Sequence, residues 1–300
     1  MKREFDAASE VLLGQCSNSP GLCAVRRRPL LSGIVAASLI VTAGCTNLKP
    51  VADFASKASV VTSYPGVAKD YPLILARLKL CGERGSAVSD EKAAERLRDS
   101  KRLLEAQTVL QAYAKALGEL AADDLPNYDH QIDALNQSLV DGKFAAASDT
   151  GNYAQAAKFG LGIFTDLYRR GKIQKLITTY NPSIQKAVAQ LLQVVDGYLV
   201  SLSDEQIVYN QLVAGRSRKA AEFLKLEGFP EFVSVAAADH AQLLLDREAN
   251  ARALSRGIKA FGQGHQELAD NIGTASFKEV LANATKYAEQ LQTVIESFNR

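Results

Sequence analysis

The chain has 300 residues, of which 47% are hydrophobic and 23% are charged, a composition typical of a folded protein rather than a disordered one. Its 35 basic and 33 acidic residues give a formal charge of +2. Residues 1–44 hold five of the basic and three of the acidic residues, so the remainder carries 30 of each. This balance gives no support for a nucleic-acid partner, whose phosphates attract strongly basic surfaces.

The first predicted element is an export signal. Three arginines at 26–28 precede an apolar run at 29–41, and small residues at 42–44 lead to Cys45. This order is typical of a secretory signal, and the run of about 15 residues is shorter than the roughly 20 that a spanning helix needs. The sequence leaves open the export route, general or twin-arginine, and the true start of the chain, because about 25 residues precede the arginines.

The segment Thr42-Ala43-Gly44-Cys45 resembles the lipobox of bacterial lipoproteins, with Thr42 in place of the usual Leu or Val. The resemblance implies a diacylglyceryl group on the sulfur of Cys45, removal of residues 1–44, and acylation of the new amino group. Two or more acyl chains anchor a protein stably. Thr46, where the family's inner-membrane proteins typically have Asp, implies the periplasmic face of the outer membrane. An uncleaved anchor helix containing Cys45 is the alternative.

The cysteines exclude a disulfide framework. Cys16 and Cys23 lie in the leader and Cys45 is the expected lipidation site, which leaves Cys81 alone in the mature chain. No intramolecular disulfide can then form, so the core must stabilise the fold. Cys81 is either a buried side chain or a thiol that pairs between chains.

Metal and catalytic patterns are missing from the sequence. None of the three histidines forms a Glu-x-x-His or His-x-x-x-His pair, the spacings that place ligands one turn apart on a helix: His130, His240 and His265. No phosphate-binding loop and no Gly-x-Ser-x-Gly elbow occurs. We therefore expect no enzyme, no cofactor and no metal.

Helical segments are predicted in chain order between the prolines, because a proline inside a helix costs about 3 kcal/mol. Residues 45–72 are expected to form a lipidated tether with a modest first helix at 51–61. Further helices are predicted at 73–80, 90–122, 128–140 and 152–179, with a loop at 141–151. The next helices start at Pro182 and at Pro230, and Thr274 is expected to cap the last one.

Apolar residues recur at steps of four and three in the two longest segments, a heptad pattern that packs helices nearly parallel or antiparallel. The first seam runs over 184–202, and a capping pattern at Ser203 predicts a kink or break there. The second seam, in 233–272, is interrupted by His240, Arg247 and His265. Glycines at 160, 162 and 171 are expected to let another helix approach closely.

These patterns predict an all-α fold, an elongated antiparallel helical bundle in which residues 73–300 form one domain. The leading functional hypothesis is a non-enzymatic lipoprotein that faces the periplasm, is held to the membrane through Cys45, and binds or braces an envelope protein.

Other functions remain open on the sequence. A carrier or sensor of a small ligand or metal would use His240, Arg247 and His265. An enzyme would use Asp246 and Glu248 beside Arg247, or Asp129, His130 and Asp133. The location also suits an antagonist of a toxin from a competing cell. The basic group at 216–225 either contacts anionic lipid or forms a solvated face with Glu222 and Glu227, and the sequence favours the solvated face.

Overall fold

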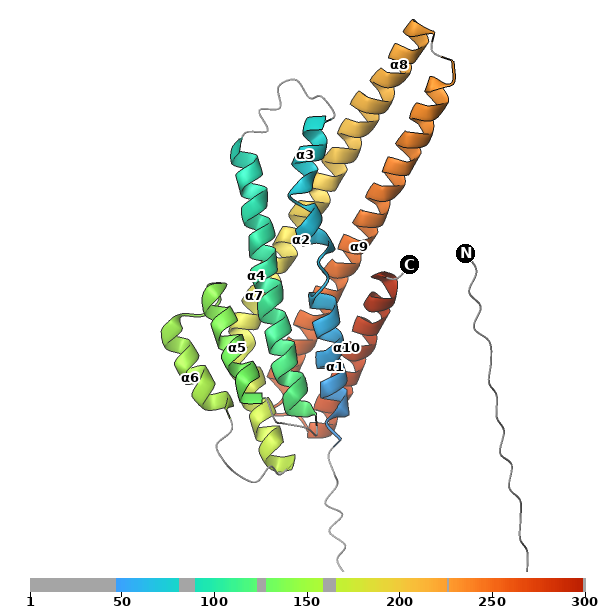
Figure 1. The fold of residues 1–300 in the computed structure, drawn as a ribbon. Helices are drawn as coiled ribbons and strands as arrows, with labels where there is room; N and C mark the ends of the chain where they lie inside the picture. The colour runs from blue at the N-terminus through green and yellow to red at the C-terminus, as the bar shows by residue number, and fades with distance from the viewer. Residues whose placement is uncertain (1–46, 81–89, 123–127, 159–165, 226, 299–300) are drawn as a thin grey trace, which may run out of the picture. The chain divides into compact units, whose positions relative to one another are not determined.

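The computed structural model describes residues 47–80, 90–122, 128–158, 166–225 and 227–298 (Figure 1). The chain divides into residues 1–44 and 45–300, and all described residues belong to the second unit. The leader, Cys45 and Cys81 lie outside the described residues. No helix among the described ranges has the length and apolar character needed to cross a membrane.

The described part of the chain is helical and contains no strand, which confirms the predicted all-α antiparallel bundle. Its elements are α1 (Lys49–Thr62), α2 (Gly66–Asp70), α3 (Leu73–Leu80), α4 (Asp90–Ala121), α5 (Tyr128–Asp141), α6 (Ala147–Ala157), α7 (Asp166–Val208), the π-helix η1 (Tyr209–Ala214), α8 (Gly215–Leu224), α9 (Phe229–Asn271) and α10 (Phe277–Phe298).

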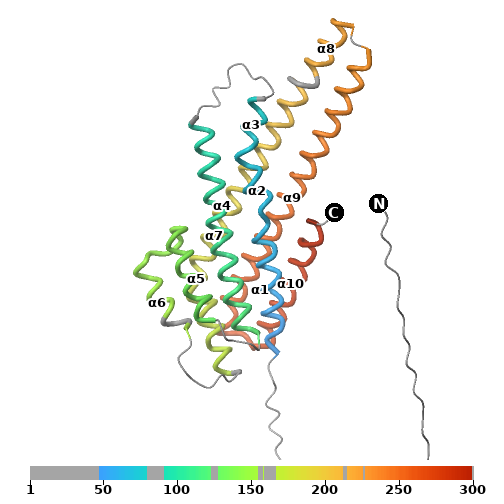
Figure 2. The backbone as a smooth tube through the Cα atoms, viewed as in Figure 1, coloured from blue at the N-terminus to red at the C-terminus, as the bar shows by residue number. Residues whose placement is uncertain are grey.

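The first helix is a core element. Val51, Phe54, Ala58 and Val61 are buried, and α1 packs against α4, α9 and α10, although α10 follows more than 200 residues later in the chain (Figure 2). The helix predicted at 51–61 is confirmed as α1, whereas the described residues from Leu48 onward pack into the core and do not form a tether. Apolar side chains spaced three and four apart give α1 one continuous buried face.

Helix α7 continues through Pro182, where the sequence predicted a helix start. The flanking Tyr180 and Ile184 are buried, and their packing offsets the roughly 3 kcal/mol that an interior proline costs. The break predicted at Ser203 is also absent, because α7 runs on to Val208 and is followed directly by η1.

Two further boundaries differ from the predictions. Helix α6 covers residues 147–151 of the predicted loop at 141–151, and Lys158 leaves the helical conformation with ψ 149°. Helix α10 is capped by Ser276, not Thr274: the Ser276 Oγ accepts from the Glu279 N–H at 3.4 Å, and Glu279 Oε2 accepts from the Ser276 N–H at 2.8 Å. This reciprocal pair is a capping box.

Close helix packing depends on glycines of α9. A Cβ at Gly257 would lie 2.5 Å from Val61 Cγ1, one at Gly262 would lie 2.8 Å from Val188 Cγ1, and one at Gly264 would lie 2.6 Å from Tyr287 Cγ. Gly171 has no neighbour within 4 Å of that position, so its predicted packing role is wrong. Gly160 and Gly162 lie outside the described residues.

Gly264→Ala is expected to lower the free energy of unfolding by about 1–3 kcal/mol, because the added methyl group overlaps the inner atoms of Tyr287, which cannot swing away. Gly171→Ala is the matched control, since its methyl group enters open space. That variant should gain about 0.5–1 kcal/mol from the better helix propensity of alanine. Urea unfolding measures both, and equal effects at the two positions would contradict the packing argument.

Candidate functional site

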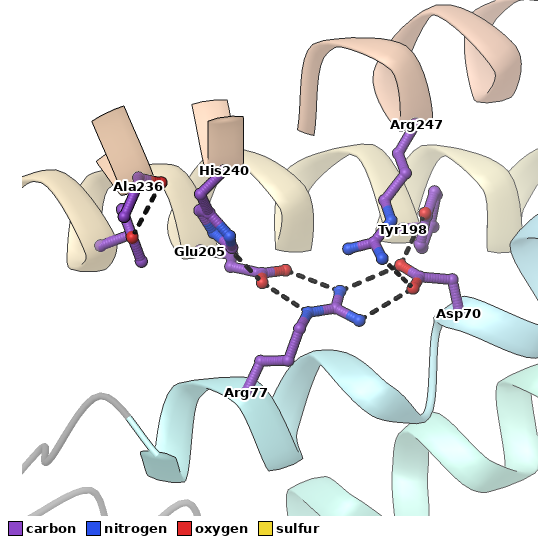
Figure 3. Close-up of polar contacts among 8 residues, drawn as sticks. Asp70, Arg77, Tyr198, Glu205, Ala236, His240 and Arg247 are labelled. Carbon is purple, nitrogen blue, oxygen red and sulfur yellow. Dashed lines mark hydrogen bonds and ion pairs between the residues drawn. The ribbon is translucent and has the colours of Figure 1, made fainter. Parts of the chain in front are cut away.

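Charged side chains from four helices meet between α7 and α9, in a group we call the polar cluster: Asp70, Arg77, Tyr198, Glu205, His240 and Arg247 (Figure 3). Asp70 ends α2, Arg77 lies on α3, Tyr198 and Glu205 lie on α7, and His240 and Arg247 lie on α9. The cluster therefore ties the short α2 and α3 to both long helices.

Arg77 is the centre of the cluster because it bridges two carboxylates. Its Nε donates to Glu205 Oε1 at 2.5 Å and its Nη2 to Glu205 Oε2 at 2.8 Å. Nη1 and Nη2 donate to the two oxygens of Asp70 at 2.8 and 3.0 Å. Burial by itself lowers the pKa of Arg77, but the hydrogen bonds to Glu205 and Asp70 outweigh it and raise that pKa above its ordinary value.

Asp70 has two further partners. The Tyr198 hydroxyl donates to Asp70 Oδ2 at 2.9 Å, and Arg247 Nη2 lies 3.4 Å from Asp70 Oδ1. Burial and then the negative charge of Asp70 raise the pKa of Tyr198, so the phenol stays protonated and acts as a donor. Each carboxylate of the cluster is thus committed to hydrogen-bond donors.

His240 stands at the edge of the cluster. Its ring stacks on Tyr209 of η1 with centroids 3.8 Å apart, and its Nε2 lies 3.8 Å from Glu205 Oε1, beyond hydrogen-bonding distance. Burial lowers the pKa of His240, Glu205 raises it, and Arg77 and Arg247 lower it, with a net decrease. The imidazole is therefore neutral at pH 7, and the two arginines balance the two carboxylates.

The cluster is built to clamp helices together. Neither carboxylate is free to act as a general base, because guanidinium groups occupy both. Two buried nitrogens of the cluster have no hydrogen-bond partner among the described residues: His240 Nε2 and Arg247 Nη1.

The second polar group lies deeper, around His265. Asn181 Oδ1 can only accept, so His265 Nδ1 carries the proton and donates to it at 2.9 Å. Nε2 then accepts from the Tyr113 hydroxyl at 2.7 Å. Burial lowers the pKa of His265 from 6.5 to about 3. Both nitrogens are used, so His265 is a fully bonded core histidine that positions α9 against α4 and α7.

The sequence singled out His240, Arg247 and His265, and the structure places the first two together and the third in the separate group around Asn181. Asp70, Arg77, Tyr198 and Glu205 were missed. Glu205 lies two residues after Ser203, within the predicted capping pattern, and Asp70 lies in the segment 45–72, where the sequence predicts a tether. Arg77, a cation within the apolar segment 73–80, was the available signal.

The acid–base groups considered for an enzyme are not assembled around these clusters. Asp246 accepts from Gln242 at 2.8 Å and Glu248 pairs with Arg252 at 2.6 Å, both within α9 at exposed positions. Asp133 pairs with Lys158 at 2.6 Å, and His130 is exposed. Within the described ranges, no group of three or more His, Cys, Asp or Glu side chains is arranged to hold a metal ion.

Comparisons of the chain with protein-family models, with curated proteins and with solved structures find no significant match.

Arg77→Met should lower the free energy of unfolding by about 3–5 kcal/mol, because it leaves the buried Glu205 carboxylate without a cation and leaves Asp70 with Arg247 alone. The control is Arg252→Met, which breaks the exposed ion pair with Glu248 and should cost less than about 1 kcal/mol. Chemical denaturation of both variants measures the difference. If Arg77→Met lowers the free energy of unfolding as little as Arg252→Met does, the cluster does not hold the helices together.

Acidification should destabilise the protein through His265. The folded state keeps its imidazole neutral down to about pH 3, whereas the unfolded chain binds a proton below about pH 6.5, so stability falls as the pH decreases between these values. At about 1.4 kcal/mol per pH unit, wild type should lose about 2 kcal/mol more than His265→Gln between pH 6.5 and pH 5. Urea unfolding at several pH values in this range measures the loss of stability, with the exposed His130→Gln as the control variant. If the free energy of unfolding falls equally with pH in wild type and in His265→Gln, the role of His265 is contradicted.

Proposed function

We propose that the protein is a lipid-anchored, periplasm-facing helical bundle of the bacterial cell envelope that binds or braces a protein partner and is not an enzyme. The observation that carries the proposal is the position of the lipobox cysteine directly before the folded body. Leu48, three residues after Cys45, is already buried in the core.

The short connection between Cys45 and α1 would hold the folded body at a fixed distance from the membrane. Three residues span at most about 10 Å, so acyl chains on Cys45 would hold the first turn of α1 close to the lipid. In Figure 1, α1 begins at the end of the helical unit remote from α8. The long helices α7 and α9 would then carry α8 away from the membrane, over about 60 Å for the 43 residues of α9.

The described polar groups support a binding or structural role. The buried carboxylates Asp70 and Glu205 are neutralised by arginine, and His265 is fully hydrogen-bonded. What the body offers instead is long helix surfaces, which commonly serve in protein recognition.

The lipid anchor is tested by metabolic labelling with palmitate. Wild-type protein should take up the label and separate with the outer membrane, whereas Cys45→Ala should lose the label and keep the leader. Thr42→Leu is the matched control, because it moves the lipobox toward the family pattern and should be labelled at least as well as wild type. Labelling that persists in Cys45→Ala would refute the assignment.

The partner is tested separately by mild crosslinking in intact cells, followed by purification and mass spectrometry. A specific envelope protein should be recovered from cells that contain the wild-type chain and should be absent from cells that lack it. Recovery of no envelope protein, with the anchor itself confirmed by labelling, would reject the binding role alone.

A carrier or sensor of a small polar ligand is the second candidate, and it is favoured by the unpaired buried nitrogens of His240 and Arg247. Native mass spectrometry of protein isolated in volatile buffer should show an added mass that disappears in Arg247→Met. Unmodified mass in wild type removes the support for this candidate.

A further inference from the structure

Beyond the polar cluster, the bundle thins to two helices. Helix α8 packs against η1 and α9, and Figure 1 shows α8 and the first part of α9 extending as a pair past α3 and α4. We call residues 215–239 the arm. Among its described residues, only Ala221 and Val233 are buried, so the arm has almost no core of its own.

Large apolar side chains gather at the end of the arm, within about one helical turn of the connection between α8 and α9. Phe223 is 86% exposed and Phe232 is 66% exposed, and Leu224 and Phe229 are also exposed. The rings of Phe229 and Phe232 lie 6.3 Å apart. Exposed apolar side chains gathered at one end of an element are typical of an interaction surface.

The two helices of the arm carry opposite charge. Helix α8 and the residue after it contain four basic residues and one acidic residue: Arg216, Arg218, Lys219, Lys225 and Glu222. The first 18 residues of α9, up to Asp246, contain Glu231, Asp239 and Asp246 and no Lys or Arg. No ion pair joins the two helices in the described part of the arm, so these charges are available to a partner.

A second copy of this chain fits both properties. With a two-fold axis parallel to the arms, two hairpins form a four-helix bundle in which each α8 lies beside its own α9 and beside the α9 of the other copy. The basic helix of each copy then faces the acidic helix of the other, and the phenylalanines meet at the centre.

From this self-complementarity we infer that the arm is a dimerisation surface, through which two copies of the chain pair side by side into a four-helix bundle. A lipid surface is a poorer occupant, because the acidic start of α9 would face anionic headgroups. The inference does not depend on acylation of Cys45, since it uses only the arm.

The first experiment measures the mass of the full chain, solubilised in detergent, by sedimentation equilibrium. Wild type should be dimeric at micromolar concentration, and Phe223→Glu combined with Phe232→Glu should weaken association by at least about tenfold, because it places charge in the apolar centre. Leu97→Glu, at an equally exposed site on α4 (63%), is the matched control and should remain dimeric. Far-UV circular dichroism confirms that each variant is folded.

The second experiment exchanges charges. One variant carries Arg218→Glu and Lys219→Glu, which makes both arm helices acidic; the other carries Glu231→Lys and Asp239→Lys, which makes both basic. Each alone should be monomeric because like charges oppose pairing, and an equimolar mixture should form a heterodimer in which opposite charges again face each other. Loss of folding cannot produce this rescue.

A monomeric wild type, or a dimer that the arm substitutions leave unchanged, would overturn the inference. Binding of the arm to a lipid bilayer can be distinguished from dimerisation by experiment. The chain has no tryptophan, so Phe223→Trp provides a single reporter in vesicles. Quenching of its fluorescence by brominated phosphatidylcholine would assign the arm to the bilayer and overturn the dimer, and unquenched emission supports it.

Discussion

The described body depends on how closely α1, α7 and α10 approach α9. Gly257, Gly262 and Gly264 remove the side chains that would hold these helices apart, and Val61, Val188 and Tyr287 occupy the space they leave. Apolar packing at these close approaches stabilises the described body. The same packing makes α1 part of the core, because Val61 of α1 fills the space beside Gly257.

Where α9 runs past the other helices, polar contacts replace apolar packing. The polar cluster lies at this transition, with Arg77 holding Asp70 of α2 and Glu205 of α7 in one network. A buried ion pair adds little net stability over an apolar contact of the same shape, but breaking it is costly. The cluster therefore fixes the place at which α7 and α9 leave the bundle, and beyond it the arm presents its surfaces without a core.

The helical class and the long heptad seams followed from the sequence, because their signals are local and repeat over many residues. The interior position of Pro182 could not be predicted in the same way, since its cost is offset by the burial of Tyr180 and Ile184, which only tertiary packing reveals. The same applies to the polar cluster. Asp70 and Glu205 are 135 positions apart, and nothing near either residue indicates that Arg77 joins them. His240 and Arg247 could be identified from the sequence because they interrupt an apolar seam. Their partners Asp70 and Glu205 could not, because they lie in segments whose local pattern predicts a tether and a helix cap.

The π-helix η1 carries a consequence for the arm. A π-turn accommodates one more residue than an α-turn, and one residue corresponds to about 100° of rotation around the helix axis. The six residues of η1 therefore change the rotational phase between α7 and α8, so the buried stripe of α7 does not continue along α8. Converting 209–214 to regular α-helix with the chain length unchanged would turn Phe223 by about 100° around the helix axis, whereas deleting one residue there would remove the π-turn and leave Phe223 on the same side of the hairpin. The direction in which the arm displays its aromatic side chains is thus set by an inserted residue in the backbone, at some distance from those side chains.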